Sequence, residues 1–230
     1  AADAQRRDRA GRPAGHRAAV TAAARAGVFI TFEGIDGSGK STQARRLADT
    51  LGARLTREPG GSPGAEEIRR LLVEGEAGRW SAETEILLFT AARRDHLEKT
   101  IRPALEAGQV IVSDRFADST RVYQGVGRAS LRDVVDRLHA LMIGQEPDLT
   151  FVIDTDPEAA LRRGLARQSG EDRFESLGVA FQAKLRAGFL ALAREYPVRV
   201  RLIDGNRAED AIAAEVAVQA RAFLAARAHG

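Results

Sequence analysis

The sequence predicts a three-layer α/β fold, in which helices flank a five-stranded parallel sheet. Two observations predict it: the chain has 230 residues, and five short β-rich segments recur between helical patterns. Alternation of strands and helices is typical of a parallel sheet covered on both faces. The predicted strands are residues 28–32, 54–56, 110–113, 149–153 and 198–203. A chain of this length can enclose one good-sized core, so residues 28–230 are expected to form a single domain.

The segments between the predicted strands carry ordinary helix signals. A helix over residues 41–51 is expected to end at Gly52, because glycine readily adopts the left-handed conformation that stops a helix. Ser81 can cap a helix that runs to about Glu98, and a short turn and another helix ending at Gly108 are expected to follow. Four apolar residues near the C-terminus fall on one helical face, which predicts core or interface packing: Ile212, Val216, Ala220 and Phe223.

The composition excludes several classes of protein. The chain has no cysteine and four scattered histidines, so disulfides, thiolate catalysis and Cys-ligated zinc are excluded and no histidine metal cluster is indicated. No apolar run reaches membrane-spanning length, and we expect a cytoplasmic protein with no membrane partner. Residues 1–27 carry a net charge of +4, whereas the rest of the chain sums to −1. The nearly neutral body does not indicate a nucleic-acid partner.

The Arg- and Ala-rich segment 1–27 has no apolar stripe, and we expect a disordered or only loosely helical N-terminal extension there. A secretory signal is not expected, because no continuous apolar stretch follows the arginines. The Arg-rich, acid-poor composition leaves a transit peptide open as an alternative to an appended tail.

Residues 34–41 fill every position of the pattern G-x-x-x-x-G-K-[ST] and lie between a predicted strand and a predicted helix. The glycines let the loop turn tightly and point backbone N–H groups at phosphate oxygens, which a Cβ would obstruct. Lys40 is then placed to reach the β- and γ-phosphates, and the Ser41 hydroxyl to take one position on Mg²⁺. The segment therefore predicts a P-loop that binds ATP with Mg²⁺.

The rest of the chain narrows the class of P-loop protein. GTPases generally recognise guanine with an [NT]-K-x-D element, and neither Lys99 nor Lys184, the lysines outside the P-loop, lies in one. Motor ATPases usually need a larger core with more strands than the five predicted here. The P-loop alone does not separate these classes. The missing guanine motif and the small predicted sheet favour a small kinase.

Several further motifs follow the P-loop in a fixed order. They are Thr-Arg-Glu-Pro-Gly-Gly at 56–61, Leu-Leu-Phe-Thr-Ala-Ala-Arg at 87–93, Ser-Asp-Arg at 113–115 with Ser-Thr at 119–120 and Tyr-Gln-Gly at 123–125, Pro-Asp-Leu at 147–149, and Asp-Arg-Phe-Glu at 172–175. Together with residues 32–42, this set resembles the bacterial thymidylate kinases, a family of nucleoside monophosphate kinases with the P-loop kinase fold. The resemblance covers roughly residues 28–230. It implies ATP-dependent phosphorylation of dTMP to dTDP in dTTP biosynthesis, with Mg²⁺ as cofactor and a homodimeric assembly.

The resemblance implies that dTMP is bound by eight residues: Asp36, Arg57, Phe89, Arg93, Arg115, Thr120, Tyr123 and Gln124. Phe89 and Arg93 are four residues apart on a predicted helix, so both side chains can project toward one ligand. By the resemblance, the Phe89 ring stacks on thymine and Arg93 contacts the edge of the base. From the residues alone, a core position is the favoured interpretation of Phe89, and Arg93 could equally be a surface arginine paired with an acid.

Arg115 follows a β-branched run, at the carboxyl end of a predicted strand, where open α/β sheets bind their ligands. By the resemblance, Arg115 and Arg57 hold the acceptor phosphate, which planar guanidinium groups suit. Thr120 and Gln124 are implied to hydrogen-bond the base. Tyr123 is implied to crowd the 2′ position of the sugar, and a buried structural tyrosine is the alternative.

The remaining implied sites concern ATP, the metal and catalysis. The ATP site is the loop and the start of its helix: Gly34, Ile35, Asp36, Gly37, Ser38, Gly39, Lys40, Ser41 and Thr42. The metal ligands are Ser41, Asp36, Asp114 and Glu175, and the catalytic residues are Lys40, Arg115, Arg167, Arg173 and Asp36. Asp36 is implied to meet the 3′-OH of the acceptor or the metal. From the residues alone, Asp114 could orient an arginine, lie near Mg²⁺ or cap the following turn.

No basic residue precedes Lys40 in the P-loop, which resembles the bacterial type whose catalytic arginines come from a mobile lid. The lid candidate is residues 162–175, with Arg163 also available there. Gly164 and residues 168–170 depart from the usual tight lid. Because arginines outnumber lysines 32 to 3 in this chain, a solvated helix face is the alternative for each lid arginine.

Two other functions stay open at this point. One is a monophosphate kinase for dUMP, dCMP, GMP or AMP, which a panel of acceptors would separate from a dTMP kinase. The other is a nucleic-acid- or protein-binding module that uses the Arg-rich tail and a nucleotide switch. Deletion of residues 1–27 would remove the partner of such a module and leave a kinase active.

Overall fold

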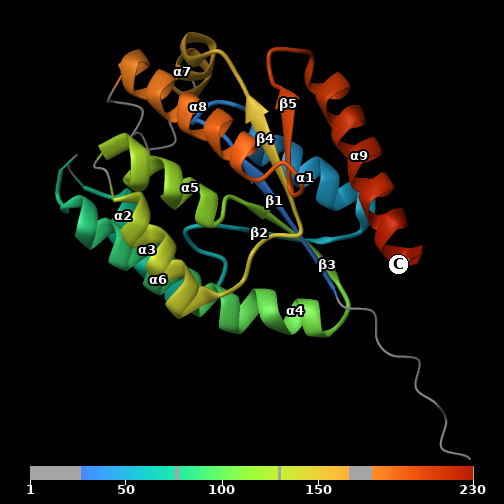
Figure 1. The fold of residues 1–230 in the computed structure, drawn as a ribbon, viewed down its shortest axis with the longest axis horizontal. Helices are drawn as coiled ribbons and strands as arrows, with labels where there is room; N and C mark the ends of the chain where they lie inside the picture. Colours follow the sequence, from blue (N-terminus) through green and yellow to red (C-terminus); the bar gives the residue numbers. More distant parts are fainter. Residues whose placement is uncertain (1–26, 76–77, 129–130, 166–177, 230) are drawn as a thin grey trace, which may run out of the picture.

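The computed structural model describes residues 27–75, 78–128, 131–165 and 178–229. In this part of the chain, all five strands of the sheet are parallel and lie in the order β2-β3-β1-β4-β5 (Figure 1). The strands are β1 (Val28–Glu33), β2 (Arg54–Arg57), β3 (Val110–Asp114), β4 (Leu149–Asp154) and β5 (Val200–Asp204). The predicted sheet is confirmed. The last strand begins two residues later than predicted, because residues 197–199 form a turn that leaves Val198 84% exposed.

The central strand β1 is buried along its whole length, as expected for a parallel sheet with both faces covered. Successive side chains point to opposite faces, so Ile30 and Phe32 pack in one core cluster and Phe29 in another. Glu33 ends the strand and shares the face of Phe29 and Thr31. The strand therefore places one buried carboxyl group where the sheet meets the P-loop.

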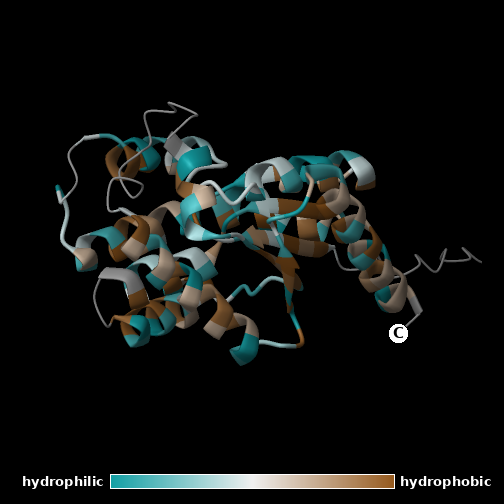
Figure 2. Cartoon of the chain, turned by 90° about the horizontal axis from the view of Figure 1, so that it is seen from above, coloured by the Kyte–Doolittle hydropathy of each residue, from teal (hydrophilic) through white to brown (hydrophobic). Residues whose placement is uncertain are grey.

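Helices cover both faces of the sheet, which confirms the three-layer architecture. Helices α1 and α9 pack on one face, and α3–α4, α5 and α8 on the other (Figure 1). Figure 2 shows the strands largely in the hydrophobic colour between these layers. The α-helices are α1 (Lys40–Leu51), α2 (Pro63–Val73), α3 (Ala82–His96), α4 (Arg102–Glu106), α5 (Ala117–Val122), α6 (Arg132–Leu138), α7 (Pro157–Leu165), α8 (Gly178–Glu195) and α9 (Glu209–His229). Three π-helical segments accompany them: η1 (Leu97–Ile101), η2 (Tyr123–Arg128) and η3 (His139–Ile143).

The predicted helix boundaries at Gly52 and Ser81 are confirmed. Gly52 is left-handed, with φ 61°, and its N–H bonds carbonyls of the last turn of α1. The Ser81 hydroxyl accepts a hydrogen bond of 3.1 Å from the Thr84 N–H at the start of α3. The predicted short turn after this helix is wrong, because α3 continues through η1 into α4 with helical backbone angles. Pro103 falls in the first turn of α4, directly after the π-helical segment η1.

The apolar face predicted for the C-terminal helix packs in the core. Ile212, Val216 and Ala220 of α9 are buried against the sheet and α1, and Phe223 is partly buried beside them. None of the described helices is both long and apolar enough to cross a membrane. Most of the expected N-terminal extension and residues 166–175 of the expected lid lie outside the described residues.

Candidate active site

The P-loop occupies the turn between β1 and α1, at the carboxyl end of the central strand. Its glycines have the positive φ angles that the motif requires: 139° at Gly34, 79° at Gly37 and 92° at Gly39. A Cβ on Gly37 would lie 1.9 Å from the Ala160 carbonyl oxygen, whereas a Cβ on Gly39 would meet no atom within 4 Å. The loop is therefore packed tightly against α7 on one side and open on the other.

Two polar groups in this loop are suited to an anion. The Ser38 hydroxyl is buried and has no hydrogen-bond partner among the described residues. Lys40 is only 6% exposed, and its Nζ lies 3.3 Å from the Ile35 carbonyl oxygen and 3.5 Å from Asp36 Oδ1. Lys40 thus lies inside the curve of the loop. Ser41 and Thr42 are exposed in the first turn of α1.

A cavity of about 250 Å³ opens beside the P-loop, and it brings the predicted acceptor residues together. The walls include all eight residues that the resemblance implied for dTMP: Asp36, Arg57, Phe89, Arg93, Arg115, Thr120, Tyr123 and Gln124. Lys40, Ser41 and Asp114 also line this cavity. The donor and acceptor sites predicted from separate motifs therefore adjoin in the folded chain.

Arg115 lies at the centre of the polar wall. Its backbone is left-handed, with φ 73°, which is uncommon for a residue with a side chain. Its Nη1 donates to Ser119 Oγ at 2.8 Å, and its Nη2 donates to Asp36 Oδ1. The Tyr123 hydroxyl donates to the other oxygen of Asp36 at 2.8 Å. Asp36, Arg115 and Tyr123 thus form one hydrogen-bonded group next to Lys40.

Asp36 and Arg115 each favour the ionised state of the other. Burial alone would raise the pKa of Asp36, but Arg115 and Lys40 outweigh it and lower the pKa to about 2. Burial likewise opposes the charge of Arg115, and the surrounding Tyr123, Asp36 and Asp114 raise its pKa above the ordinary value. Asp36 is therefore a carboxylate and Arg115 a cation throughout the physiological pH range.

Arg93 is held by a buried carboxylate. Its Nε donates to Glu58 Oε2 at 2.7 Å and its Nη2 to Thr120 Oγ1 at 2.9 Å. The other oxygen of Glu58 lies 3.0 Å from His96 Nδ1, and His96 Nε2 lies 2.7 Å from Thr56 Oγ1. Arg93 is 3% exposed, so it is a buried arginine and not the surface residue left open by the sequence.

Phe89 and Gln124 complete the wall near Arg93. Phe89 is partly exposed and lines the cavity one turn before Arg93, so the two side chains share one face of α3. The Gln124 amide donates to Glu85 Oε2 at 3.1 Å, and both side chains are buried. Arg57 is half-exposed at the rim, where its Nη2 donates to Glu66 Oε2 at 3.1 Å.

The cavity also fits a divalent cation beside a nucleotide. Asp114 Oδ1 is buried and has no hydrogen-bond partner among the described residues, and Asp36 and Ser41 line the same space. No group of three or more His, Cys, Asp and Glu side chains forms a metal site within the described ranges. Mg²⁺ usually takes one or two protein carboxylates and completes its shell with phosphate oxygens and water, so this sparse set suits it.

Some residues of the cavity were not predicted as site residues. Glu58, Pro59 and Ser119 lie in motifs that the sequence displays, and only their roles were missed. Three further lining residues come from α2, where no pattern pointed to them: Arg69, Leu72 and Val73. Glu33 does not line the cavity but accepts hydrogen bonds from Phe116 and Ser119, which do. Its position directly before the P-loop was the sequence feature that could have indicated this role.

Three predicted residues cannot be compared with the structure: Arg167, Arg173 and Glu175 lie outside the described residues. Arg163 is described, on the exposed side of α7, with Nη1 at 3.5 Å from the Gly205 carbonyl oxygen. The structure therefore describes the position of the predicted acceptor side and of the P-loop but not that of the lid arginines.

A P-loop at the carboxyl end of the central strand, with a cationic acceptor-sized cavity beside it, defines this chain as a P-loop kinase of small molecules. A family profile described as Thymidylate kinase matches residues 32–216. The chain is 68% identical to the thymidylate kinase of Ruegeria pomeroyi, over 83% of this chain and 92% of that relative. It is 69% identical to that of Dinoroseobacter shibae, over 83% and 94%.

A solved structure agrees with these sequence matches. The crystal structure of thymidylate kinase from Ehrlichia chaffeensis has a TM-score of 0.68 and 36% identity to this chain, and the match covers 85% of this chain and 99% of that one. The chain belongs to the thymidylate kinase family. It is a transferase that phosphorylates dTMP to dTDP, a step in dTTP biosynthesis.

Proposed function

We propose that this chain transfers the γ-phosphoryl group of Mg²⁺-bound ATP in line to the phosphate of dTMP, which lies in the cavity beside the P-loop. One observation carries this proposal. All eight residues expected for dTMP line a single cavity together with Lys40, although they come from segments far apart in the chain. Donor and acceptor phosphates bound there would be neighbours, which is the main requirement of phosphoryl transfer.

On the donor side, the P-loop binds the phosphates of ATP. The backbone N–H groups around Gly37, Ser38 and Gly39 surround the β-phosphate, and Lys40 reaches the β- and γ-phosphates. Asp114, Asp36 and Ser41 would hold Mg²⁺, with Glu175 as a further candidate from the lid. When bound, Mg²⁺ neutralises charge that develops on the phosphate oxygens.

On the acceptor side, Arg115 and Arg57 bind the phosphate of dTMP. Arg115 is already fixed by Asp36, Ser119 and Tyr123, so little side-chain entropy is lost when the acceptor binds. Arg57 is half-exposed and paired with Glu66, and it can exchange this partner for a phosphate. Tyr123, hydrogen-bonded to Asp36, is proposed to lie against the sugar.

The thymine base occupies the wall formed by Phe89 and Arg93. The Phe89 ring provides the stacking surface, and Arg93 and Gln124 provide polar contacts to the edge of the base. The partners of Arg93 fix its guanidinium before the base arrives. A general base is not required, because the attacking phosphate oxygen of dTMP is already anionic.

The lid contributes the remaining catalytic charge in this proposal. Arg167 and Arg173 would neutralise the transferring phosphoryl group when residues 162–175 close and exclude water. The family resemblance also supports a homodimer and a cytoplasmic location. Light scattering of the purified chain measures the assembly state, and a monomer at working concentrations would contradict the dimer.

A kinetic test uses an acceptor panel with a matched pair of lysine variants. We expect ATP-dependent diphosphate formation with dTMP to exceed that with dUMP, dCMP, GMP or AMP. Lys40→Ala should lower the rate by about a hundredfold or more, with the fold intact by circular dichroism. Lys99→Ala is the control, because the Lys99 side chain is 59% exposed on η1 and is not part of the cavity lining. Full dTDP formation by Lys40→Ala would remove this lysine from the mechanism.

A further inference from the structure

The turn that carries Arg115 needs support, because Arg115 is the one residue other than glycine with a positive φ among the described residues. Such a backbone persists when its surroundings determine it, and it is typical of functional sites. Three hydrogen bonds fix this turn. Arg115 N–H donates to the Phe32 carbonyl at 2.9 Å, the Ser113 hydroxyl donates to the Arg115 carbonyl at 2.8 Å, and Phe116 N–H donates to Glu33 Oε1 at 2.8 Å.

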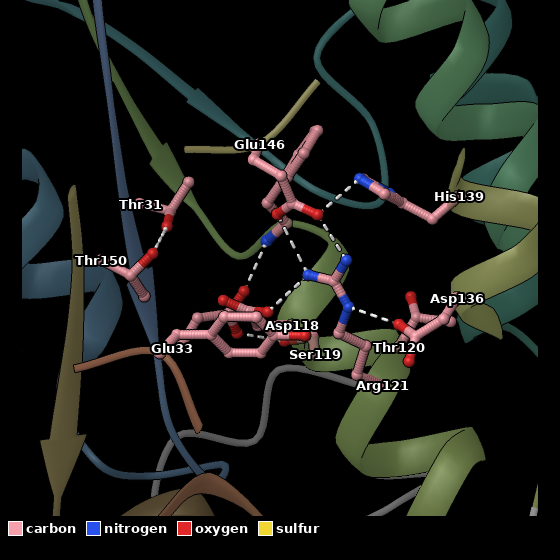
Figure 3. Close-up of polar contacts among 12 residues, drawn as sticks. Thr31, Glu33, Asp118, Ser119, Thr120, Arg121, Asp136, His139, Glu146 and Thr150 are labelled. Atoms are coloured by element: carbon pink, nitrogen blue, oxygen red, sulfur yellow. Dashed lines mark hydrogen bonds and ion pairs between the residues drawn. The ribbon is translucent and has the colours of Figure 1, made fainter. Parts of the chain in front are cut away.

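The second oxygen of Glu33 reaches the guanidinium through Ser119. The Ser119 hydroxyl donates to Glu33 Oε2 at 2.5 Å and accepts from Arg115 Nη1 at 2.8 Å (Figure 3 shows Glu33 and Ser119). A hydroxyl has one proton, so the bond to Glu33 turns its lone pairs toward Arg115. Glu33 therefore fixes both the backbone and the side chain of the Arg115 segment.

Glu33 itself does not reach the cavity. It is fully buried, on the face of β1 that packs against α5, and it is absent from the cavity lining. We propose that Glu33 is a positioning residue for Arg115, holding through Ser119 and the Phe116 N–H the left-handed turn that presents the guanidinium to the acceptor phosphate. This inference rests on the proposed role of Arg115 in binding the phosphate of dTMP.

Ion pairs fix the residue before Ser119 in the first turn of α5. Asp118 is 2% exposed and accepts from Arg121 Nη1 at 2.8 Å and from Arg199 Nη1 at 2.6 Å. Arg121 also donates to Glu146, on the segment before β4, at 2.5 Å (Figure 3). These contacts join α5 to the segments that precede β4 and β5. The Ser119 hydroxyl is thus held by Glu33 on β1 and by the fixed first turn of α5, and it can orient the Arg115 guanidinium.

The substitution Glu33→Gln tests this role with little change of volume. Glu33 accepts from two donors, one at each oxygen, and a glutamine side chain has a single acceptor oxygen. The glutamine amide nitrogen must therefore oppose either the Phe116 N–H, which then loses its acceptor, or Ser119, whose hydroxyl must turn from donor to acceptor. We expect kcat/KM for dTMP to fall about tenfold, the usual effect of disrupting one buried hydrogen bond. The KM for ATP should change by less than about twofold, because Glu33 is proposed to act through Arg115 on the acceptor phosphate.

Thr31→Val is the matched control. Thr31 lies two residues before Glu33 on the same face of β1, is fully buried, and shares a side-chain hydrogen bond of 2.8 Å with Thr150 (Figure 3). This variant loses a buried polar contact of the same strand but keeps all the hydrogen bonds that fix the turn at Arg115. It should keep kcat/KM for dTMP within about twofold of the parent. A loss equal to that of Glu33→Gln would show a general effect of the strand and overturn the inference.

A double-mutant cycle with Arg115→Ala separates positioning from a structural effect. If Glu33 acts through Arg115, Glu33→Gln should lower kcat/KM for dTMP by less than about twofold in the Arg115→Ala background. A full tenfold loss in that background would overturn the role of Glu33 and leave that of Arg115 intact. No effect of Arg115→Ala alone would overturn the proposed role of Arg115 and the inference with it.

Ser119→Ala provides a second variant should Glu33→Gln fail to fold. It removes the link between Glu33 and the guanidinium but leaves the bond to the Phe116 N–H. The same selective loss for dTMP over ATP supports the inference. An unchanged kcat/KM for dTMP would overturn it.

Discussion

Replacement of Phe89 by alanine isolates the stacking wall of the acceptor cavity. Phe89 lies on α3, one turn before Arg93, and its ring is partly exposed at the cavity surface. Stacking of a base on an aromatic ring contributes about 1–3 kcal/mol. Phe89→Ala should therefore raise the Kd of dTMP about 5- to 150-fold, and the Kd of ATP should stay nearly constant.

The expected loss of stability is smaller than for a core phenylalanine. A fully buried Phe→Ala change costs about 3–5 kcal/mol, including the cavity that it leaves. Phe89 already borders open space, so only the transfer of its buried part is lost, about 1 kcal/mol. For a chain of this size, this corresponds to a fall in Tm of about 2–4 °C.

Isothermal titration of dTMP and of ATP, with a thermal melt of each variant, measures these quantities. Phe223→Ala is the matched control, because Phe223 is also partly buried but lies on α9 against the opposite core cluster. It should lower the Tm and leave the Kd of dTMP unchanged. An equal rise in Kd for dTMP and ATP in Phe89→Ala, or a Tm loss typical of a buried phenylalanine, would refute the assignment of this wall to the base.

Three further predictions concern carboxyl groups. Glu58→Ala leaves Arg93 buried without its carboxylate and should lower the free energy of unfolding by about 3–5 kcal/mol in urea titrations, more than Glu58→Gln; equal losses would contradict the ion pair. Burial, and then the charge of Asp118, raise the pKa of Glu33 to about 7 against the opposing effect of Arg115. The folded state thus binds this proton more tightly than the unfolded state. The contribution to stability is therefore complete below about pH 4.5 and is lost as the pH rises through 7, by on the order of 3 kcal/mol. Unfolding measured from pH 4 to 8 should show this slope in the parent and not in Glu33→Gln, and coinciding slopes would contradict it. Asp114→Asn should raise the Mg²⁺ concentration for half-maximal activity about tenfold or more, with the KM for ATP unchanged at saturating Mg²⁺; an unaltered Mg²⁺ titration would exclude Asp114 from the metal site.

Local patterns were sufficient for the fold and for part of the site. The strands and the P-loop follow from runs of apolar residues and from glycines at fixed positions, which act within a few residues of each other. The helical spacing of Phe89 and Arg93 likewise placed both on one wall. The continuous helix from α3 to α4 was not predicted, although Pro103 lies in it directly after the π-helical segment η1, because a proline inside a helix usually ends or kinks it.

The sequence by itself determined the sheet, the P-loop and the residue types of the acceptor site. The tertiary structure decided which polar groups are partners: Glu58 with Arg93, Asp36 with Arg115, and Glu33 with Ser119. These partners are 35, 79 and 86 residues apart, so no local spacing relates them. The order of the strands brings them into one buried region, where an ionised group is stable only with a fixed counter-charge or hydrogen bond.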